Sequence, residues 1–110
     1  MIKAEAIRNK DGKIVSLTVK GHANSAPKGQ DLVCAAVSTV LVGGCNALEQ
    51  PELFTIKLNP GDAYIAIKGN PNKHDRDLLH IMWVQLKTIE FSNAEYLHVI
   101  EKGNSLCYLY

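Results

Sequence analysis

Alternation of apolar and polar residues is the first regularity that the chain shows. Residues 1–8 and 13–20 each place an apolar side chain at nearly every second position, which is the period of a half-buried β-strand. Between them, Asn9-Lys10-Asp11-Gly12 consists of turn residues, and Gly12 tolerates a positive φ. The first 20 residues therefore predict a β-hairpin.

The same alternation returns later in the chain. Residues 53–58 and 63–68 flank the segment Asn59-Pro60-Gly61-Asp62, in which proline and then glycine occupy the two central positions of a type II turn. This pattern predicts a second hairpin. Residues 96–102 alternate once more and predict a final strand.

Two longer segments have the character of helices. Residues 32–48 form an apolar run that is too long for a typical strand, in spite of its valines, and Asp31 just before it is a suitable N-cap. A helix that is apolar nearly all round needs cover on more than one side, which suggests a subunit interface as well as a sheet. Residues 75–91 carry apolar side chains at three- and four-residue intervals, and we expect Asp75 and Asp77 to serve the start of this helix.

These elements predict a fold of the α+β class with the order ββαββαβ. Adjacent hairpins favour an antiparallel sheet, and two helices would cover it. A length of 110 residues corresponds to a single domain over residues 1–110, large enough to form a core without metals or disulfides.

Composition and charge narrow the classes of function. The net charge is +1 and no block of like charge occurs, which argues against direct nucleic acid binding. The N-terminal residues lack the apolar core of a signal peptide, and the longest apolar run is shorter than the roughly 20 residues of a membrane span. We therefore expect a cytoplasmic protein without membrane association, in which the three cysteines, Cys34, Cys45 and Cys107, are free thiols.

The candidate chemistry lies between the second strand and the first helix, where His22 and Cys34 are close in sequence. If Asp31 caps the helix, Cys34 is its third residue, and the unpaired N–H groups of the first turn would favour a thiolate and a developing oxyanion. His22 would accept the thiol proton. Ser38 lies four residues after Cys34 and hence on the same helical face, and Asp31 is the nearest group that could orient His22.

Simpler explanations exist for each of these residues. A cysteine in an apolar helix is commonly a small core residue, and a histidine after a strand is commonly a surface residue. Asp31 could serve only as an N-cap, and Ser38 could bond its own backbone. His74 and His80 are six residues apart and do not share a helical face, and the chain has no Cys-x-x-Cys motif, so we expect no metal site and no cofactor.

A family resemblance adds weight to the catalytic interpretation. Gly21-His22-Ala23, followed by Gly29 and by Asp31-Leu32-Val33-Cys34-Ala35-Ala36-Val37-Ser38, resembles the signature of the ribosomal-processing cysteine proteases (the Prp, or YsxB-like, family). The resemblance covers the whole length, including Gln85-Leu86-Lys87 in the second helix. It departs from the family at Cys45, where a small residue without a thiol is more common, and in the apolar tail from Leu106 to Tyr110.

The resemblance implies a cysteine endopeptidase that works through an acyl-enzyme, with His22 as base and Cys34 as nucleophile. Asp31 and Ser38 would be supporting residues. The loop 23–30 would be a flap over the substrate, and the motif residues assigned to the flap are Ala23 and Gly29 in this loop and Gly21 just before it.

The resemblance also implies partners. Family members are homodimers that remove the N-terminal extension of a large-subunit ribosomal protein (number twenty-seven), cleaving after paired aromatic residues. The alternative function is a non-catalytic ribosome-assembly or peptide-binding module that uses the loop or an exposed sheet edge. A thiol-based redox or metal sensor would need a second ligand near Cys34, which the sequence does not offer.

Overall fold

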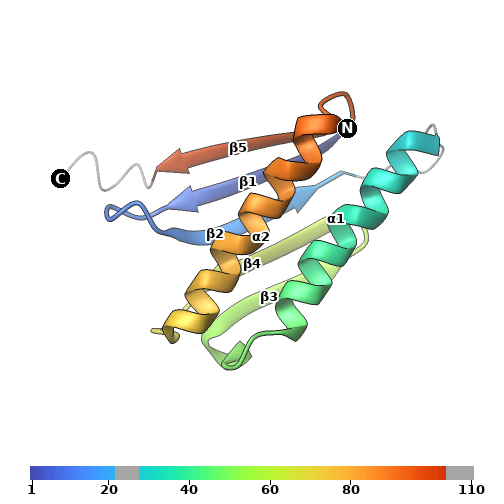
Figure 1. Ribbon diagram of the computed structural model, residues 1–110. Helices are drawn as coiled ribbons and strands as arrows, with labels where there is room; N and C mark the ends of the chain where they lie inside the picture. The colour runs from blue at the N-terminus through green and yellow to red at the C-terminus, as the bar shows by residue number, and fades with distance from the viewer. Residues whose placement is uncertain (22–27, 104–110) are drawn as a thin grey trace.

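The alternating and helical segments fold into a layer of five strands and a layer of two helices (Figure 1). The computed structural model describes residues 1–21 and 28–103, and for residues 28–31 it describes only the backbone. In chain order, the elements are β1 (Ile2–Arg8), β2 (Ile14–Lys20), α1 (Lys28–Asn46), the short 3-10 helix η1 (Pro51–Leu53), β3 (Phe54–Asn59), β4 (Asp62–Ile67), α2 (Lys73–Ser92) and β5 (Leu97–Gly103). The predicted α+β class and ββαββαβ order are confirmed.

The sheet has the strand order β3-β4-β2-β1-β5, and one of its pairs is parallel. The hairpins β1–β2 and β3–β4 are antiparallel, as is the β2–β4 pair that joins them. However, β5 runs parallel to β1, with Ile2 opposite Leu97. The prediction of an antiparallel sheet is therefore wrong for this pair, and the sheet is mixed. The cause is α2, which follows β4 in the chain and crosses the sheet before β5 begins. Because of this crossover, β5 runs in the same direction as β4 and therefore also in the same direction as β1.

Both helices lie on the same face of the sheet, and the core lies between the two layers (Figure 1). In β1 the side chains of Ile2, Ala4 and Ala6 are buried, whereas Lys3 between them is exposed. The core side of the helices is made of large apolar residues, which are Val33, Val37 and Leu41 on α1 and Leu79, Met82, Trp83 and Leu86 on α2. In the described part of the chain, neither helix is both long and apolar enough to span a membrane.

The two helices are in close contact at a glycine of α1. A Cβ atom added at Gly44 would lie 2.3 Å from the sulfur of Met82, which is buried in α2. A Cβ atom at the neighbouring Gly43 would meet no atom within 4 Å. The absence of a side chain at Gly44 therefore sets the distance between the helices, whereas Gly43 has no such role.

Asp75 of α2 is hydrogen-bonded to the segment that connects α1 to η1. Its side chain is fully buried, and its oxygens accept hydrogen bonds from the backbone N–H groups of Glu49 at 2.9 Å and Gln50 at 2.7 Å. The N-cap of α2 is Asn72, whose side chain accepts a hydrogen bond from the backbone N–H of Asp75. Asp75 thus lies in the first turn of the helix, as expected, but its carboxylate holds the α1–η1 connection.

Candidate active site

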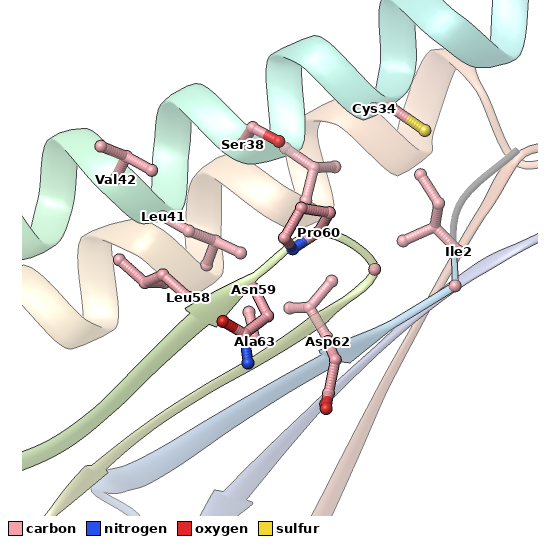
Figure 2. Close-up of a pocket in the computed structure, with 14 residues that line it drawn as sticks. Ile2, Cys34, Ser38, Leu41, Val42, Leu58, Asn59, Pro60, Asp62 and Ala63 are labelled. Carbon is pink, nitrogen blue, oxygen red and sulfur yellow. The ribbon is translucent and has the colours of Figure 1, made fainter. Parts of the chain in front are cut away.

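A pocket of about 360 Å³ lies between α1 and the β3–β4 turn (Figure 2). Four parts of the chain line it: the start of β1, the end of β2, the α1 segment from residue 34 to residue 42, and residues 58–63. Its walls are mostly apolar, with Ile2, Val19, Val37, Leu41, Val42 and Leu58 among them. The pocket is therefore suited to binding an apolar group of a ligand.

Cys34 lines this pocket from α1. Its side chain is half-buried and packs against the edge of the hydrophobic core. Figure 2 shows its sulfur on the side of α1 that faces the strands, near Ile2. Ser38 follows one turn later and lines the same pocket, so the two residues share a helical face as their spacing predicts.

The start of α1 differs from the prediction. The helix begins at Lys28 and ends at Asn46, whereas the sequence predicted residues 32–48. Asp31 is therefore the fourth residue of α1 and not its N-cap. Lys28 and Gln30 are good helix formers, and they offset the weaker helix preference of Gly29 and Asp31.

This shift changes the electrostatics expected at Cys34, which is the seventh residue of α1. The backbone N–H groups without an intrahelical partner belong to the first four residues, and the effect of the helix dipole falls off within the first turn. The predicted placement of Cys34 in that turn is wrong. The helix start therefore supplies neither the thiolate stabilisation nor the oxyanion donors that the sequence led us to expect.

Gly21 is the described residue next to His22, and it lines the same pocket as Cys34. Its φ is 104°, a conformation that favours glycine, and its N–H donates a 3.1 Å hydrogen bond to the carbonyl oxygen of Gly61. A Cβ atom here would lie 2.4 Å from the carbonyl oxygen of Met1. His22 itself lies outside the described residues, but its attachment point is at the wall of the pocket.

The predicted flap falls mostly outside the described residues. Ala23 and the rest of residues 22–27 are not described. The backbone of Gly29 is, and it belongs to the first turn of α1. The loop between β2 and α1 is therefore shorter than the predicted range of 23–30, because residues 28–30 are helical.

The β3–β4 turn is the part of the pocket that the sequence did not reveal. The motif predicted the turn itself, and Gly61 has the expected positive φ of 72°. Its position against α1 follows from the pairing of β4 with β2, which local pattern cannot indicate. Asp62 forms a 2.6 Å ion pair with Lys57, which keeps the pKa of Asp62 below its ordinary value, and Figure 2 shows its carboxylate directed away from Cys34.

The second described thiol, Cys45, differs from Cys34 in its surroundings. Cys45 is partly buried against the core and does not line the pocket, and burial raises the pKa of its thiol. A raised pKa lowers the fraction of reactive thiolate at neutral pH. Cys107 lies outside the described residues.

One group of possible metal ligands occurs among the described residues, away from this pocket. Atoms of Glu49, His74 and Asp75 lie within 4.8 Å of one another. However, both oxygens of Asp75 already accept backbone hydrogen bonds, and one of them also lies 2.8 Å from Nδ1 of His74. The arrangement is explained by its role in joining α1 to α2.

Comparisons with known proteins identify the family. The family model of the cysteine protease Prp matches residues 1–98. The chain is 34% identical over 95 residues to the ribosomal processing cysteine protease Prp of Staphylococcus aureus, and this alignment covers 82% of this chain and 89% of that protein. It is 38% identical over 89 residues to the protein of the same name from Mycoplasma genitalium, covering 79% of this chain and 88% of the relative.

A solved structure resembles the whole fold. The crystal structure of the essential ribosomal processing protease Prp from S. aureus, in complex with a covalently linked product peptide, superposes with a TM-score of 0.78. The alignment covers 93% of this chain and 100% of that one, at 30% identity. The fold, the cysteine at the pocket and the match over residues 1–98 lead to one conclusion: the chain belongs to the cysteine protease Prp family.

Proposed function

We propose that this cysteine protease removes the N-terminal extension of a large-subunit ribosomal protein (number twenty-seven), with His22 and Cys34 as its catalytic dyad. The observation that carries the proposal is that Cys34 and Gly21, the neighbour of His22, line one apolar pocket. The relatives that it matches are named ribosomal processing proteases, and the structure from S. aureus holds a covalently linked product peptide.

The pocket supports a peptide substrate with apolar side chains next to the scissile bond. Its volume of about 360 Å³ has room for a large apolar side chain, and Leu41, Val42 and Leu58 would surround it. The family resemblance implies paired aromatic residues before the cleavage point. Burial of an aromatic ring in such a pocket is worth on the order of 2 kcal/mol of binding free energy.

The proposed reaction has two steps. In the first, the thiolate of Cys34 attacks the peptide carbonyl, and the thiol proton, held by His22, passes to the departing amine. The new C–S bond makes a thioester with the N-terminal fragment, and the C–N bond breaks. In the second, His22 takes a proton from water, the hydroxide attacks the thioester, and Cys34 leaves and recovers a proton.

His22 would also stabilise the thiolate. Because Cys34 is the seventh residue of α1, the helix start contributes little, and a histidinium in contact with the sulfur would stabilise the thiolate instead. Asp31 precedes Cys34 by about one helical turn and would orient His22, and Ser38 would contact the substrate at the pocket wall.

The test is cleavage of a synthetic peptide that carries the extension and the residues after it. The parent protein should cut it, and Cys34→Ala and His22→Ala should each lower kcat by at least a factor of about 10³. Cys45→Ala is the matched control, because it removes a thiol of the same helix outside the pocket and should leave cleavage nearly unchanged. If neither the parent nor Cys34→Ser cleaves the peptide and both bind it equally well, the alternative of a non-catalytic peptide-binding module is supported.

We also propose that two copies of the chain associate through the outer face of the helix layer. Large apolar side chains are exposed on this layer: Leu32 on α1 and Ile81, Val84 and Phe91 on α2. Phe91 is 91% exposed, which is costly for a side chain that water alone would cover. Light scattering should give the mass of a dimer for the parent and of a monomer for Val84→Lys, and a monomeric parent would contradict this.

A ribosomal substrate would place the reaction in the cytoplasm.

A further inference from the structure

A second pocket lies at the opposite end of the sheet from Cys34. Its volume is about 390 Å³, and it lies between the β1–β2 turn and the first two turns of α2. The Cys34 pocket contains Ile2 from the start of β1, whereas this pocket contains Arg8 from its end. The two pockets share no lining residue, so they are separate sites.

Basic side chains dominate this second pocket. Arg8, Lys13, Lys73, Arg76 and His80 line it, and Asp77 is its one acidic lining residue. Four of the chain's 12 Lys and Arg residues are thus gathered around one of its 11 acidic residues, although the net charge of the whole chain is only +1. The near-neutral total therefore hides a local concentration of positive charge.

The two arginines of the pocket are held in place by other groups. Arg8 donates hydrogen bonds to the carbonyl oxygen of Gly12 and to Glu101. Arg76 donates to the carbonyl oxygen of Pro71 and to the side chain of Asn70. These contacts fix two guanidinium groups as walls of the pocket without neutralising Arg76, since both of its partners are uncharged.

The remaining basic groups converge on Asp77. Lys73 forms a 2.5 Å ion pair with it, but the pair is exposed, with 88% of the Lys73 side chain in solvent. Such a pair contributes little and opens easily. The charges of Lys13 and His80 also act on Asp77 and, after Lys73, help to hold its pKa below the ordinary value. One carboxylate therefore faces three basic side chains, and the pocket retains an excess of positive charge.

We propose that this pocket binds a phosphate-bearing anion. A phosphate group offers several oxygens and up to two negative charges, which suits a cluster of lysines and arginines better than a single carboxylate does. The volume is that of a small-ligand site, and Ile14, Val15 and Ile67 give it an apolar floor for an attached organic group. The phosphate could belong to a free phosphorylated compound or to the backbone of RNA, because both present the same oxygens.

Lys13 and Lys10 provide a matched pair of variants. Both belong to the loop region of the first hairpin and are exposed, but only Lys13 lines the pocket. Calorimetric titration with inorganic pyrophosphate should show saturable binding to the parent protein. Lys13→Gln should weaken it about fivefold and Lys10→Gln should leave it within twofold, because direct contacts depend on position and long-range attraction on total charge. Lys73→Gln, on another element, serves if Lys13→Gln folds poorly.

A fluorescein-labelled ten-nucleotide RNA distinguishes the two sources of phosphate. If the RNA binds and pyrophosphate displaces it, the site recognises the RNA backbone; if pyrophosphate alone binds, the ligand is a free phosphorylated compound. Either result supports the proposal. The proposal is overturned if neither probe binds saturably, or if Lys10→Gln weakens binding as much as both pocket lysine variants do.

Discussion

The backbone N–H of Gly21 donates a 3.1 Å hydrogen bond to the carbonyl oxygen of Gly61. This bond joins the end of β2 to the β3–β4 turn, and both glycines line the pocket that contains Cys34. The residue after Gly21 is His22, so this hydrogen bond fixes the backbone position directly before the proposed catalytic base. Gly21 and Gly61 thereby define one wall of the candidate active site.

Gly21→Ala should impair catalysis more than a comparable change elsewhere. The substitution places a Cβ atom 2.4 Å from the carbonyl oxygen of Met1 at a φ of 104°, so the backbone before His22 has to move. We expect kcat/KM for the extension peptide to fall by a factor of about 10² or more. Gly12→Ala is the control, because it has a similar φ of 77° but open space around it and lies outside the pocket. Equal losses of activity in the two variants would contradict a positioning role for Gly21.

Adjacent glycines of α1 should differ in their effect on stability. Gly44→Ala forces a methyl group against the buried side chain of Met82 and should lower the free energy of unfolding by about 1–3 kcal/mol. Gly43→Ala meets no neighbour and should be neutral or stabilising by up to about 1 kcal/mol, because alanine favours the helix. Urea unfolding of both variants measures the difference. A stable Gly44→Ala would show that the helices do not pack as closely as described.

Two aspartates of α2 provide a similar pair. Asp75→Asn keeps the shape of the side chain but replaces one of its two acceptor oxygens with an NH2 donor, so that one of the two backbone N–H groups loses its partner, and it should cost about 2–3 kcal/mol of unfolding free energy. Asp77→Asn, at an exposed position, should change stability by less than about 0.5 kcal/mol. Urea midpoints compare them directly. The proposed role of Asp75 would be untenable if both variants matched the parent.

His74 should make stability depend on pH near neutrality. Its hydrogen bond with Asp75 raises the pKa of His74 above the ordinary value of 6.5, burial opposes this, and Glu49 and Asp77 add to the rise. Because the folded pKa is the higher one, the stabilisation is complete below pH 6.5 and is lost as the pH rises through the folded value. The parent should therefore be more stable than His74→Gln at pH 5.5, and this advantage should shrink by pH 8.5. Urea unfolding at the two pH values measures it, and a constant difference would contradict the assignment.

Asp75 acts at the acidic end of the pH range. Burial alone would raise its pKa, but hydrogen bonds from Glu49, His74 and Gln50 outweigh burial and lower it from the ordinary value of 3.8. Its stabilisation is therefore present above pH 3.8 and is lost as the pH falls through the lower folded value. We expect the free energy of unfolding of the parent to decrease as the pH falls below 3.8, and that of Asp75→Asn to decrease less. Urea unfolding of the parent and Asp75→Asn at several acidic pH values measures this. If the free energies of unfolding of the two proteins fall in parallel below pH 4, the assignment to Asp75 is contradicted.

The alkylation rates of the cysteines test the chemistry of the pocket. At neutral pH, iodoacetamide should modify Cys34 faster than Cys45, because Cys45 is outside the pocket and burial raises the pKa of its thiol. Mass spectrometry of digested protein gives both rates in one sample. His22→Ala should slow the reaction of Cys34 and leave that of Cys45 unchanged. Faster modification of Cys45 would argue against an activated thiol at Cys34.

Local pattern predicted most of the fold. Alternation in residues 1–20 and the Pro60-Gly61 turn gave both hairpins, because strand faces and turns are encoded by neighbouring residues. The parallel pairing of β5 with β1 depends on how α2 crosses the sheet, which involves residues more than 90 positions apart. The alternating pattern of residues 96–102 is compatible with either direction, so the sequence could not decide it.

The site was predicted less completely than the fold. Cys34 and Ser38 share a face because their spacing is that of one helical turn, and the pocket confirms this. Asp31 was expected to be the N-cap because aspartate favours that position, but α1 begins at Lys28, four residues before the predicted start. The position of the β3–β4 turn at the pocket wall could not be predicted, because the turn comes next to α1 only through tertiary packing.

The most direct test of the proposed mechanism is to look for the acyl-enzyme. The protein is mixed with the extension peptide, quenched in acid within the first turnover and analysed by intact-mass and peptide mass spectrometry. We predict a mass increase equal to the free N-terminal fragment less one water molecule, located on Cys34, and no adduct in Cys34→Ala. Cleavage of the peptide by Cys34→Ala at the parent rate, or an adduct on Cys45 instead of Cys34, would contradict the account.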